Sequence, residues 1–388
     1  MIRPASTGLS GAIPAHLQRT GTATGSGDVR ILCTEANRAY RTDPPTLGRM
    51  RVLLLLAIAT LAATAVDLPA ALVPRWDAAV DRGFAHLAKR QRSDGAYQGG
   101  DGDWSGVVGA TLLAHLSHGH TPDHPRYGSE VRKDIAWLLR CRQPDGLVFN
   151  HGIAPIYQHG LAVLAMAETY GEYRDADLHL AIENGVERIC RWQNPRGGWR
   201  HLASQQDGDE LPSSVIQFMA LRAAKNAGFR VPEDTIAQGL AYVRSAQRRM
   251  GAGGDGGFVY SPPAGDSNWP RTGAGIACLV MGGAYRDSGI HEGIEYLTGF
   301  APLGRKQAAE KTWWMYGAWF STLAFQQASR MGVREKGLWD SFYPRMVDAV
   351  ISRQREDGGW GGDHDPFDTA AALIVLGFRL DYLPIHQL

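Results

Sequence analysis

The stretch Arg353-Gln354-Arg355-Glu356-Asp357-Gly358-Gly359-Trp360 decides the fold of this chain, because variants of it recur along the sequence. It combines a glutamine, a glycine turn and an aromatic residue, and it follows an amphipathic segment. The related stretches run from Gln91 to Tyr97, from Gln143 to Phe149, from Gln193 to Trp199 and from Gln247 to Tyr260. A loop that recurs at a steady spacing is typical of repeat architectures.

The spacing of these glutamines predicts six repeats. Successive steps from Gln91 are 52, 50 and 54 residues, and the last step, to Gln354, is 107 residues, or two repeats. A glycine lies eight residues before most of the glutamines, as Gly239 does before Gln247. Gly293 follows Gly239 by 54 residues and marks the fifth repeat, in which Ala301 replaces the glutamine.

Each repeat is predicted to contain two helices. The first helix has one apolar face between charged residues, as expected for a helix with one solvated side. The first helices are expected over 78–91, 131–143, 181–193, 235–247, 290–300 and 343–354. The second helices, with few charges and many small residues, are expected over 107–116, 156–170, 214–224, 272–281, 316–327 and 369–378. Helices with one solvent-exposed face alternate with buried helices along the chain. This alternation predicts an all-α (α/α)6 toroid, in which six helical hairpins form two concentric rings. An open, curved solenoid is the alternative.

The N-terminal region is predicted to lie outside this domain. Residues 1–49 are rich in Ser, Thr, Gly, Arg and Pro, which is typical of a disordered segment. We expect Met50 to be the true start and residues 1–49 to be an over-extended gene start. Residues 50–65 have a basic start, an apolar run and small residues up to Ala65, the pattern of a signal peptide cleaved near Ala65. A tethering helix is the alternative. Export to the periplasm or the medium follows from the first interpretation, and residues 74–388 form the single toroid domain.

The composition excludes several functions. A net charge of +1 gives no argument for nucleic acid or for an anionic membrane surface. The four cysteines have no CxxC or Cys/His spacing of a zinc site. We therefore expect no metal and no cofactor. The oligomeric state is left open.

A glutamine eight residues after a glycine, followed by a glycine turn and an aromatic residue, resembles the QW repeat of squalene-hopene and other terpenoid cyclases. It is also similar to the repeats of protein prenyltransferase β subunits. The resemblance covers residues 74–388 and implies an α/α toroid with a central ligand site. The glutamine turn itself is interpreted as structural, because an amide both donates and accepts hydrogen bonds at a helix end.

In such a toroid the N-termini of the second helices surround one mouth of the ring. Residues expected there are mostly aromatic with a few polar groups, which suits a concave site for an apolar ligand. The predicted ligand-binding residues are Tyr157, His159, Trp269, Arg271, Trp313, Trp314 and Tyr316.

The segment Asp365-Pro366-Phe367-Asp368-Thr369-Ala370 resembles the Asp-x-Asp-Asp-Thr-Ala motif of squalene-hopene cyclases. In that family the middle aspartic acid protonates the polyene, and Phe367 takes its place here. A phenyl ring has no proton to donate, so cyclisation by this motif is not predicted. If the chain is catalytic, Asp365 and Asp368 are the predicted acids; a helix cap is the other interpretation of Asp368.

Three hypotheses follow. The first is an exported terpenoid-cyclase-like or prenyltransferase-like repeat protein that binds a hydrophobic, isoprenoid or lipid-like ligand in an aromatic centre. The second is an extracytoplasmic glycosidase or polysaccharide lyase, which needs two carboxylates facing the site or a basic side chain. The third is a non-catalytic scaffold that binds a protein partner.

Overall fold

The structure, a computed structural model, describes residues 68–387 except 201, 203–207, 301, 305–312, 334–336 and 362–363. These residues belong to one compact unit, Ala63–Leu388. The tail (1–49) and the signal peptide (50–65) lie outside the described residues, as does Ala301, so those three assignments stay predictions. None of the described helices is both long enough and apolar enough to cross a bilayer.

The described part of the chain contains twelve α-helices and two short 3-10 turns, η1 (Met250–Ala252) and η2 (Pro384–His386). Its only β-structure consists of isolated bridges. The first helix of each repeat is α2 (Val73–Arg90), α4 (Gly128–Arg140), α6 (Ala176–Arg191), α8 (Glu233–Ser245), α10 (Ser288–Thr298) and α12 (Leu338–Ile351). The second helix of each repeat is α3 (Ser105–Ser117), α5 (Pro155–Glu172), α7 (Leu211–Asn226), α9 (Trp269–Met281), α11 (Trp314–Arg330) and α13 (Asp365–Gly377).

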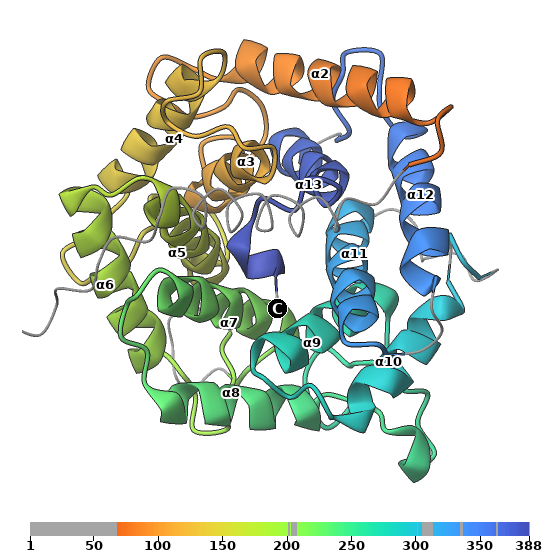
Figure 1. Ribbon diagram of the computed structural model, residues 1–388. Helices are drawn as coiled ribbons and strands as arrows, with labels where there is room; N and C mark the ends of the chain where they lie inside the picture. The colour runs from red at the N-terminus through yellow and green to blue at the C-terminus, as the bar shows by residue number, and fades with distance from the viewer. Residues whose placement is uncertain are drawn as a thin grey trace, which may run out of the picture. The chain divides into compact units, whose positions relative to one another are not determined.

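The helices form two concentric rings (Figure 1). The second helices line the inner ring, in which each helix contacts the next and α13 returns to contact α3. The first helices surround them, and α12 meets α2 on the outside. The ring is therefore closed, which confirms the toroid over the open solenoid.

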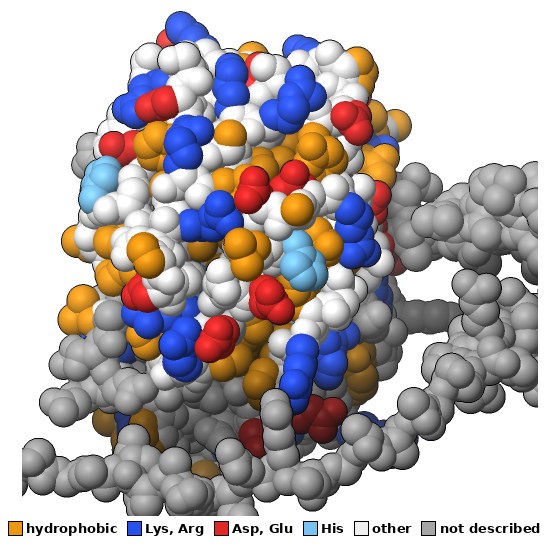
Figure 2. Space-filling model, turned by 90° about the vertical axis from the view of Figure 1, so that its left-hand side faces the viewer, with side chains coloured by type: hydrophobic (Ala, Val, Ile, Leu, Met, Phe, Trp, Pro, Cys, Tyr) orange, Lys and Arg blue, Asp and Glu red, His pale blue; other side chains and the backbone are white. Residues whose placement is uncertain are grey.

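The sequence explains which helices lie inside. The inner helices are buried on nearly all sides; all residues of α3, for example, are buried. Glycines let their backbones approach: a Cβ on Gly109 of α3 would lie 2.9 Å from the carbonyl oxygen of Leu161 in α5. The outer helices keep a polar face, and Figure 2 shows acidic and basic side chains intermingled over one outer side of the unit.

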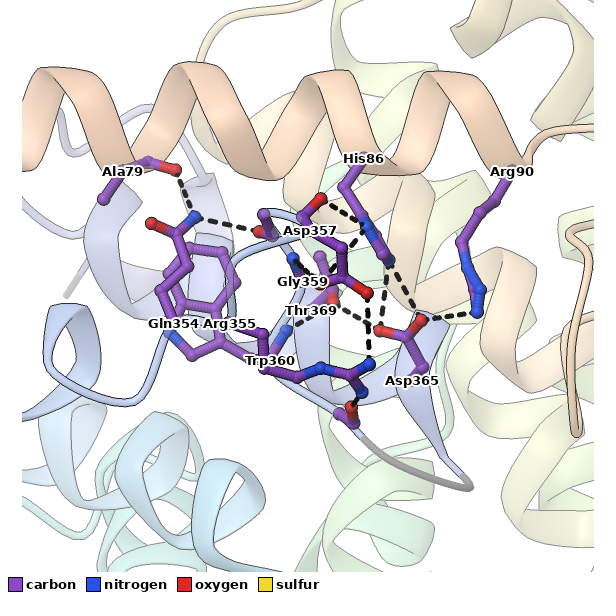
Figure 3. Close-up of polar contacts among 12 residues, drawn as sticks. Ala79, His86, Arg90, Gln354, Arg355, Asp357, Gly359, Trp360, Asp365 and Thr369 are labelled. Atoms are coloured by element: carbon purple, nitrogen blue, oxygen red, sulfur yellow. Dashed lines mark hydrogen bonds and ion pairs between the residues drawn. The ribbon is translucent and has the colours of Figure 1, made fainter.

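The glutamine turn joins neighbouring repeats, as the turns of Gln193, Gln247 and Gln354 show. The Gln354 side-chain amide donates to the carbonyl oxygen of Gly358 in its own turn and to that of Ala79 in α2, both at 2.9 Å (Figure 3). Gln193 and Gln247 each make the same two kinds of bond, to their own turn and to the next outer helix. The turn is thus a structural connection, and the bond from Gln354 to α2 closes the ring.

Two of the glycines that lie eight residues before a glutamine, Gly83 and Gly239, make room for the aromatic ring of the preceding turn. A Cβ on Gly83 would lie 2.8 Å from the ring of Trp360. The indole N–H of Trp360 also donates to the carbonyl oxygen of Val350, 2.7 Å away in its own repeat. One side chain therefore packs on two repeats.

Two details differ from the sequence-based expectation. The outer helices end before the glutamine; Gln91, for example, has an extended backbone (φ −70°, ψ 125°), and its amide donates to the carbonyl oxygen of Glu130 and to Asp134. In the second repeat the residue in the position of Trp360 is Val148 rather than Phe149, since Val148 follows the positive-φ Gly146 by two residues, as Trp360 follows Gly358.

The C-terminal segment lies at the centre of the inner ring (Figure 1). The backbone N–H of Ile385 donates to Glu168 of α5, and Arg330 of α11 donates to the carbonyl oxygen of His386. Leu383, Ile385 and His386 are buried. The segment therefore fills the ring centre at the C-terminal ends of the inner helices; the opposite end of the ring, at their N-termini, is called the mouth below.

Candidate functional site at the N-terminal mouth of the inner ring

Three aromatic side chains point toward the ring centre from the first turns of inner helices. They are Tyr157 in α5, Tyr316 in α11 and Phe367 in α13. Their directions follow from helix geometry, in which successive residues turn by about 100°, combined with contacts that fix the opposite side of each helix.

In α5 and α13 the opposite side is fixed by the glutamine turns. The backbone N–H of Trp360 donates to Thr369 Oγ1 at 3.0 Å, and the N–H of Val148 donates to His159 Nδ1 at 2.9 Å. Phe367 and Tyr157 each lie two residues before these contacts, about 200° around the helix. Both therefore face away from the outer ring and toward the centre.

In α11 the outward side is fixed by Phe325, whose ring stacks on Phe342 of α12 at 4.0 Å between centroids. Tyr316 is nine residues earlier, half a turn away. Because α5 and α11 occupy opposite places in the six-membered ring, Tyr157 and Tyr316 face each other across the centre. Burial raises the pKa of both phenols. The interaction between the two side chains lowers the pKa of Tyr157 and raises the pKa of Tyr316.

Backbone strain marks the same two helices. Ala154 (φ 53°) and Trp313 (φ 74°) precede Tyr157 and Tyr316 by three residues, and both adopt the left-handed conformation. Such residues cost about 1–3 kcal/mol each and collect at functional sites. The Tyr316 side chain is also buried, and its hydroxyl interacts with the side chain of Tyr157. Backbone strain in front of two facing tyrosines favours a ligand site here.

Asp365 lies on the outer side of α13, within an ion-pair cluster (Figure 3). Its carboxylate is 2.9 Å from His86 Nε2 and 2.8 Å from Arg90, both in α2, and it accepts a hydrogen bond from Thr369. Burial alone would raise its pKa, but the hydrogen bond and charge of His86 and the charge of Arg90 bring the pKa below its usual value. Asp365 is held as a carboxylate that closes the ring, so this geometry gives no support to its predicted role as an acid.

Asp368 lies at the mouth between α13 and α11. Gly377, nine residues later and half a turn around, approaches Ser117 of α3, so Asp368 faces the opposite neighbour, α11. Burial raises its pKa to about 6. A carboxyl group with this pKa is partly protonated near neutral pH and suits general acid catalysis.

The rim of the mouth carries an exposed aromatic platform. Trp313 is 55% exposed, and its ring stacks on His364 at 5.8 Å with an interplanar angle of 15°. His364 Nδ1 lies 2.9 Å from a carboxylate oxygen of Asp101. On the same loop as Asp101, Asp103 pairs with His151 at 3.1 Å.

The remaining predicted residues are spread around the mouth. Trp269 is buried against Trp314, at 6.1 Å between centroids, and the guanidinium of Arg353 lies 3.9 Å over the Trp314 ring. Arg271 is half-buried, donates to the carbonyl oxygen of Asp266, and has its pKa lowered by burial. These contacts tie Trp269, Trp314 and Arg271 to neighbouring helices and loops.

The structure therefore brings Tyr157, Tyr316, Trp313 and Asp368 to the mouth and places His159 elsewhere. His159 is fully buried; it accepts from the turn, and its Nε2 lies 3.2 Å from the carbonyl oxygen of Gly185 in α6. It takes the place that Ser214, Thr272 and Thr369 take in other repeats.

The pair of His364 and Asp101 was not predicted from the sequence, because their contact joins residues 263 positions apart. The central position of Phe367 follows from its place two residues before Thr369.

The fold and this mouth define an α/α toroid with an aromatic centre. No family model of protein sequences matches this chain, and no curated protein sequence matches it closely enough to count as a relative. Solved structures do match. The GH76A α-1,6-mannanase from Salegentibacter superposes with a TM-score of 0.59 at 10% identity, covering 79% of this chain and 99% of the mannanase. The type II terpene cyclase MstE from Scytonema superposes with a TM-score of 0.53 at 13% identity, covering 80% and 99%.

A family 76 mannosidase from Bacteroides thetaiotaomicron is similar as well, with a TM-score of 0.54 at 11% identity over 78% of this chain and 98% of the mannosidase. At these identities the likeness concerns the fold. The chain has the α/α toroid that terpene cyclases and family 76 glycosidases share.

Proposed function

We propose that this toroid binds an isoprenoid or other lipid-like ligand along the axis of its inner ring, with access through the N-terminal mouth. The observation that carries the proposal is the set of Tyr157, Tyr316 and Phe367, which turn toward the centre at one level of three inner helices. An apolar, aromatic wall with few polar groups is what a hydrophobic ligand requires. The similar cyclase MstE has been solved with geranylgeranyl dihydroxybenzoate, an isoprenoid substrate, in a toroid of this kind.

The architecture supports the same direction of binding. The C-terminal segment occupies the ring centre at the other end, so a ligand would enter beside Tyr157, which is partly exposed. The exposed ring of Trp313 beside the mouth offers a first apolar contact. We propose that the chain is exported by residues 50–65 and meets its ligand outside the cytoplasm.

Any acid chemistry on such a ligand is assigned to Asp368 in this proposal. Its pKa of about 6 leaves a useful fraction protonated near neutral pH, whereas His86 and Arg90 hold the pKa of Asp365 below its usual value. Phe367, which faces the centre, would stabilise a carbocation through its ring face but supplies no proton.

The test is native mass spectrometry of the purified full chain, followed by lipid extraction. We expect an apolar ligand of isoprenoid or acyl type to co-purify. Phe367→Glu, which places a charge at the ring centre, should abolish this, whereas Leu180→Glu at a 48%-exposed position of α6 should retain the ligand. Circular dichroism of both variants shows whether they fold. A folded Phe367→Glu variant that keeps the same ligand would refute axial binding.

One observation favours a second candidate, the hydrolysis of a glycan. The mouth combines the exposed ring of Trp313, Asp368 with a pKa of about 6, and the further carboxylates of Asp101 and Asp103. A glycosidase needs one protonated and one ionised carboxyl group across its site. The family 76 enzyme with a similar fold is an α-1,6-mannanase. The assay is therefore the release of reducing ends from α-1,6-mannan. Activity that Asp368→Asn abolishes would support this candidate over the first.

A further inference from the structure

The C-terminal half of the inner ring carries buried polar side chains at its centre that the fold does not explain. Glu168 follows Tyr157 by eleven residues in α5, and Gln327 follows Tyr316 by eleven residues in α11. Eleven residues bring a helix back to nearly the same face, about 16 Å further along the axis. Glu168 and Gln327 therefore face each other across the ring centre, as the two tyrosines do at the mouth.

These side chains are buried and only partly paired. Gln327 is fully buried, and neither its amide nitrogen nor its amide oxygen has a hydrogen-bond partner among the described residues. His386 of the C-terminal segment is 2% exposed, and its Nε2 also lacks a partner there. Glu168 is 5% exposed and accepts from the backbone N–H of Ile385 at 3.2 Å.

The charge at this place is close to zero. Burial raises the pKa of Glu168 to about 8, so its carboxyl group is mostly protonated at neutral pH. Burial likewise lowers the pKa of His386 to about 3, so its ring is neutral. Arg330, which donates to the carbonyl oxygen of His386, is paired with Asp381 at 2.6 Å. An incoming anion would thus meet a carboxyl group and a guanidinium that already has a partner.

A buried amide with no partner is unfavourable, and a buried polar group is normally satisfied by protein, by water or by a ligand. Gln327 offers both a donor and an acceptor, and His386 Nε2 offers a third polar atom. The matching chemistry is an uncharged oxygen that can donate and accept, which is a hydroxyl group.

We propose that Glu168, Gln327 and His386 bind the neutral, hydroxyl-bearing end of the ligand, whose apolar chain runs along the axis to the aromatic residues of the mouth. This inference rests on the proposed binding of an isoprenoid or lipid-like ligand. It narrows the proposed ligand class to a long-chain alcohol, as opposed to a hydrocarbon or a diphosphate. It also places the hydroxyl end of the ligand at the end of the ring that the C-terminal segment fills.

The test compares three C15 probes with matched apolar chains on the purified full chain: farnesol, farnesene and farnesyl diphosphate. Dissociation constants are measured by titration calorimetry in matched detergent. We expect farnesol to bind about tenfold more tightly than farnesene, the size of effect that one or two neutral hydrogen bonds give. Farnesyl diphosphate should bind more weakly than farnesol.

Two neighbouring glutamines of α11 provide the test variant and its control. Gln327→Leu should remove the preference for farnesol and leave farnesene binding unchanged. Gln326→Leu is the control, because the amide nitrogen of Gln326 lies 3.5 Å from the carbonyl oxygen of Phe378, the residue that follows α13. That variant should keep the preference.

The outcomes separate this inference from the function on which it rests. If none of the three probes binds, the proposed lipid function fails. If farnesene binds as tightly as farnesol, the ligand is lipid-like but the hydroxyl site is wrong, and the polar cluster holds only water. If farnesyl diphosphate binds most tightly, or if Gln326→Leu has the larger effect, the assignment of this site is overturned.

Discussion

The carboxylate of Asp365 is a structural group whose loss should be costly. It is buried between His86 and Arg90 of α2, and removing one partner of a buried ion pair typically costs about 3 kcal/mol or more because the other charge stays behind. We expect Asp365→Asn to lower the free energy of unfolding by about 2–4 kcal/mol in urea titrations. Asp94→Asn removes the carboxylate of an exposed pair with Arg92, and should change the value by less than about 0.5 kcal/mol.

A loss of activity without a loss of stability in Asp365→Asn would contradict the ring-closing role and return Asp365 to the catalytic candidates. The sequence predicted this residue as an acid because its motif resembles one that protonates alkenes. Whether a carboxyl group near the start of a helix faces the ring centre or the outer ring depends on rotation about the helix axis. The positions of Thr369 and Trp360, which fix that rotation, become clear only when the hydrogen bond between them is seen.

At the scale of one element, the glycine turn makes a sharp prediction. Gly358 has φ +90°, and a Cβ there would lie 2.6 Å from the carbonyl oxygen of Arg82. Gly358→Ala should therefore lower the free energy of unfolding by about 2–3 kcal/mol through left-handed strain and a backbone clash. Gly171→Ala in α5 is the matched change, because nothing lies within 4 Å of its Cβ position, and it should be neutral or stabilising. Equal effects of both substitutions in thermal unfolding would show that the turn is not under this constraint.

The end of α3 gives a prediction for pH. Burial lowers the pKa of His115 to about 3, of His118 to about 4 and of His120 to about 2, so all three are neutral in the folded protein. In the unfolded chain they take up protons near pH 6.5. Their contribution to stability is thus complete above pH 6.5 and is lost as pH falls from 6.5 toward the folded values, by up to about 1.4 kcal/mol per pH unit for each histidine.

The check is the free energy of unfolding measured between pH 7.5 and 5. His120→Phe should reduce the acid slope, since the ring lies among Phe84 and Tyr127, which an aromatic replacement can still contact. His291→Phe at an exposed position of α10 should leave the slope unchanged. If His120→Phe does not alter the dependence of the unfolding free energy on pH, the histidines at the end of α3 do not cause the loss of stability in acid.

For the whole molecule, the periodicity of the sequence was sufficient to predict the fold. The spacing of the glutamine turns predicts the six repeats and the order of the helices, and the positions of the charged residues predict which helices are buried. The helix boundaries differ from expectation by a few residues. The site was predictable only in part. The N-termini of the inner helices place Tyr157, Tyr316 and Asp368 at one mouth, but the pair of His364 and Asp101 and the return of the C-terminal segment to the ring centre are contacts between distant parts of the chain, which no local pattern encodes.

Closure distinguishes this toroid from an open array of repeats, and truncation tests that difference. In an open solenoid each unit contacts only its neighbours, so the end units can be removed and the rest stays folded. Here α13 contacts α3, and Gln354 donates to α2, so the last repeat covers the first. Deleting residues 337–388 would expose the apolar faces of α2, α3 and α11 together and remove the C-terminal segment from the centre. We expect this fragment to lose its cooperative unfolding transition by circular dichroism and urea titration, whereas a full chain with Leu180→Glu keeps it. The contrary result is a fragment that unfolds cooperatively, with a dependence of the unfolding free energy on urea concentration that is reduced only in proportion to its length. That result would mean that the repeats are stable without ring closure.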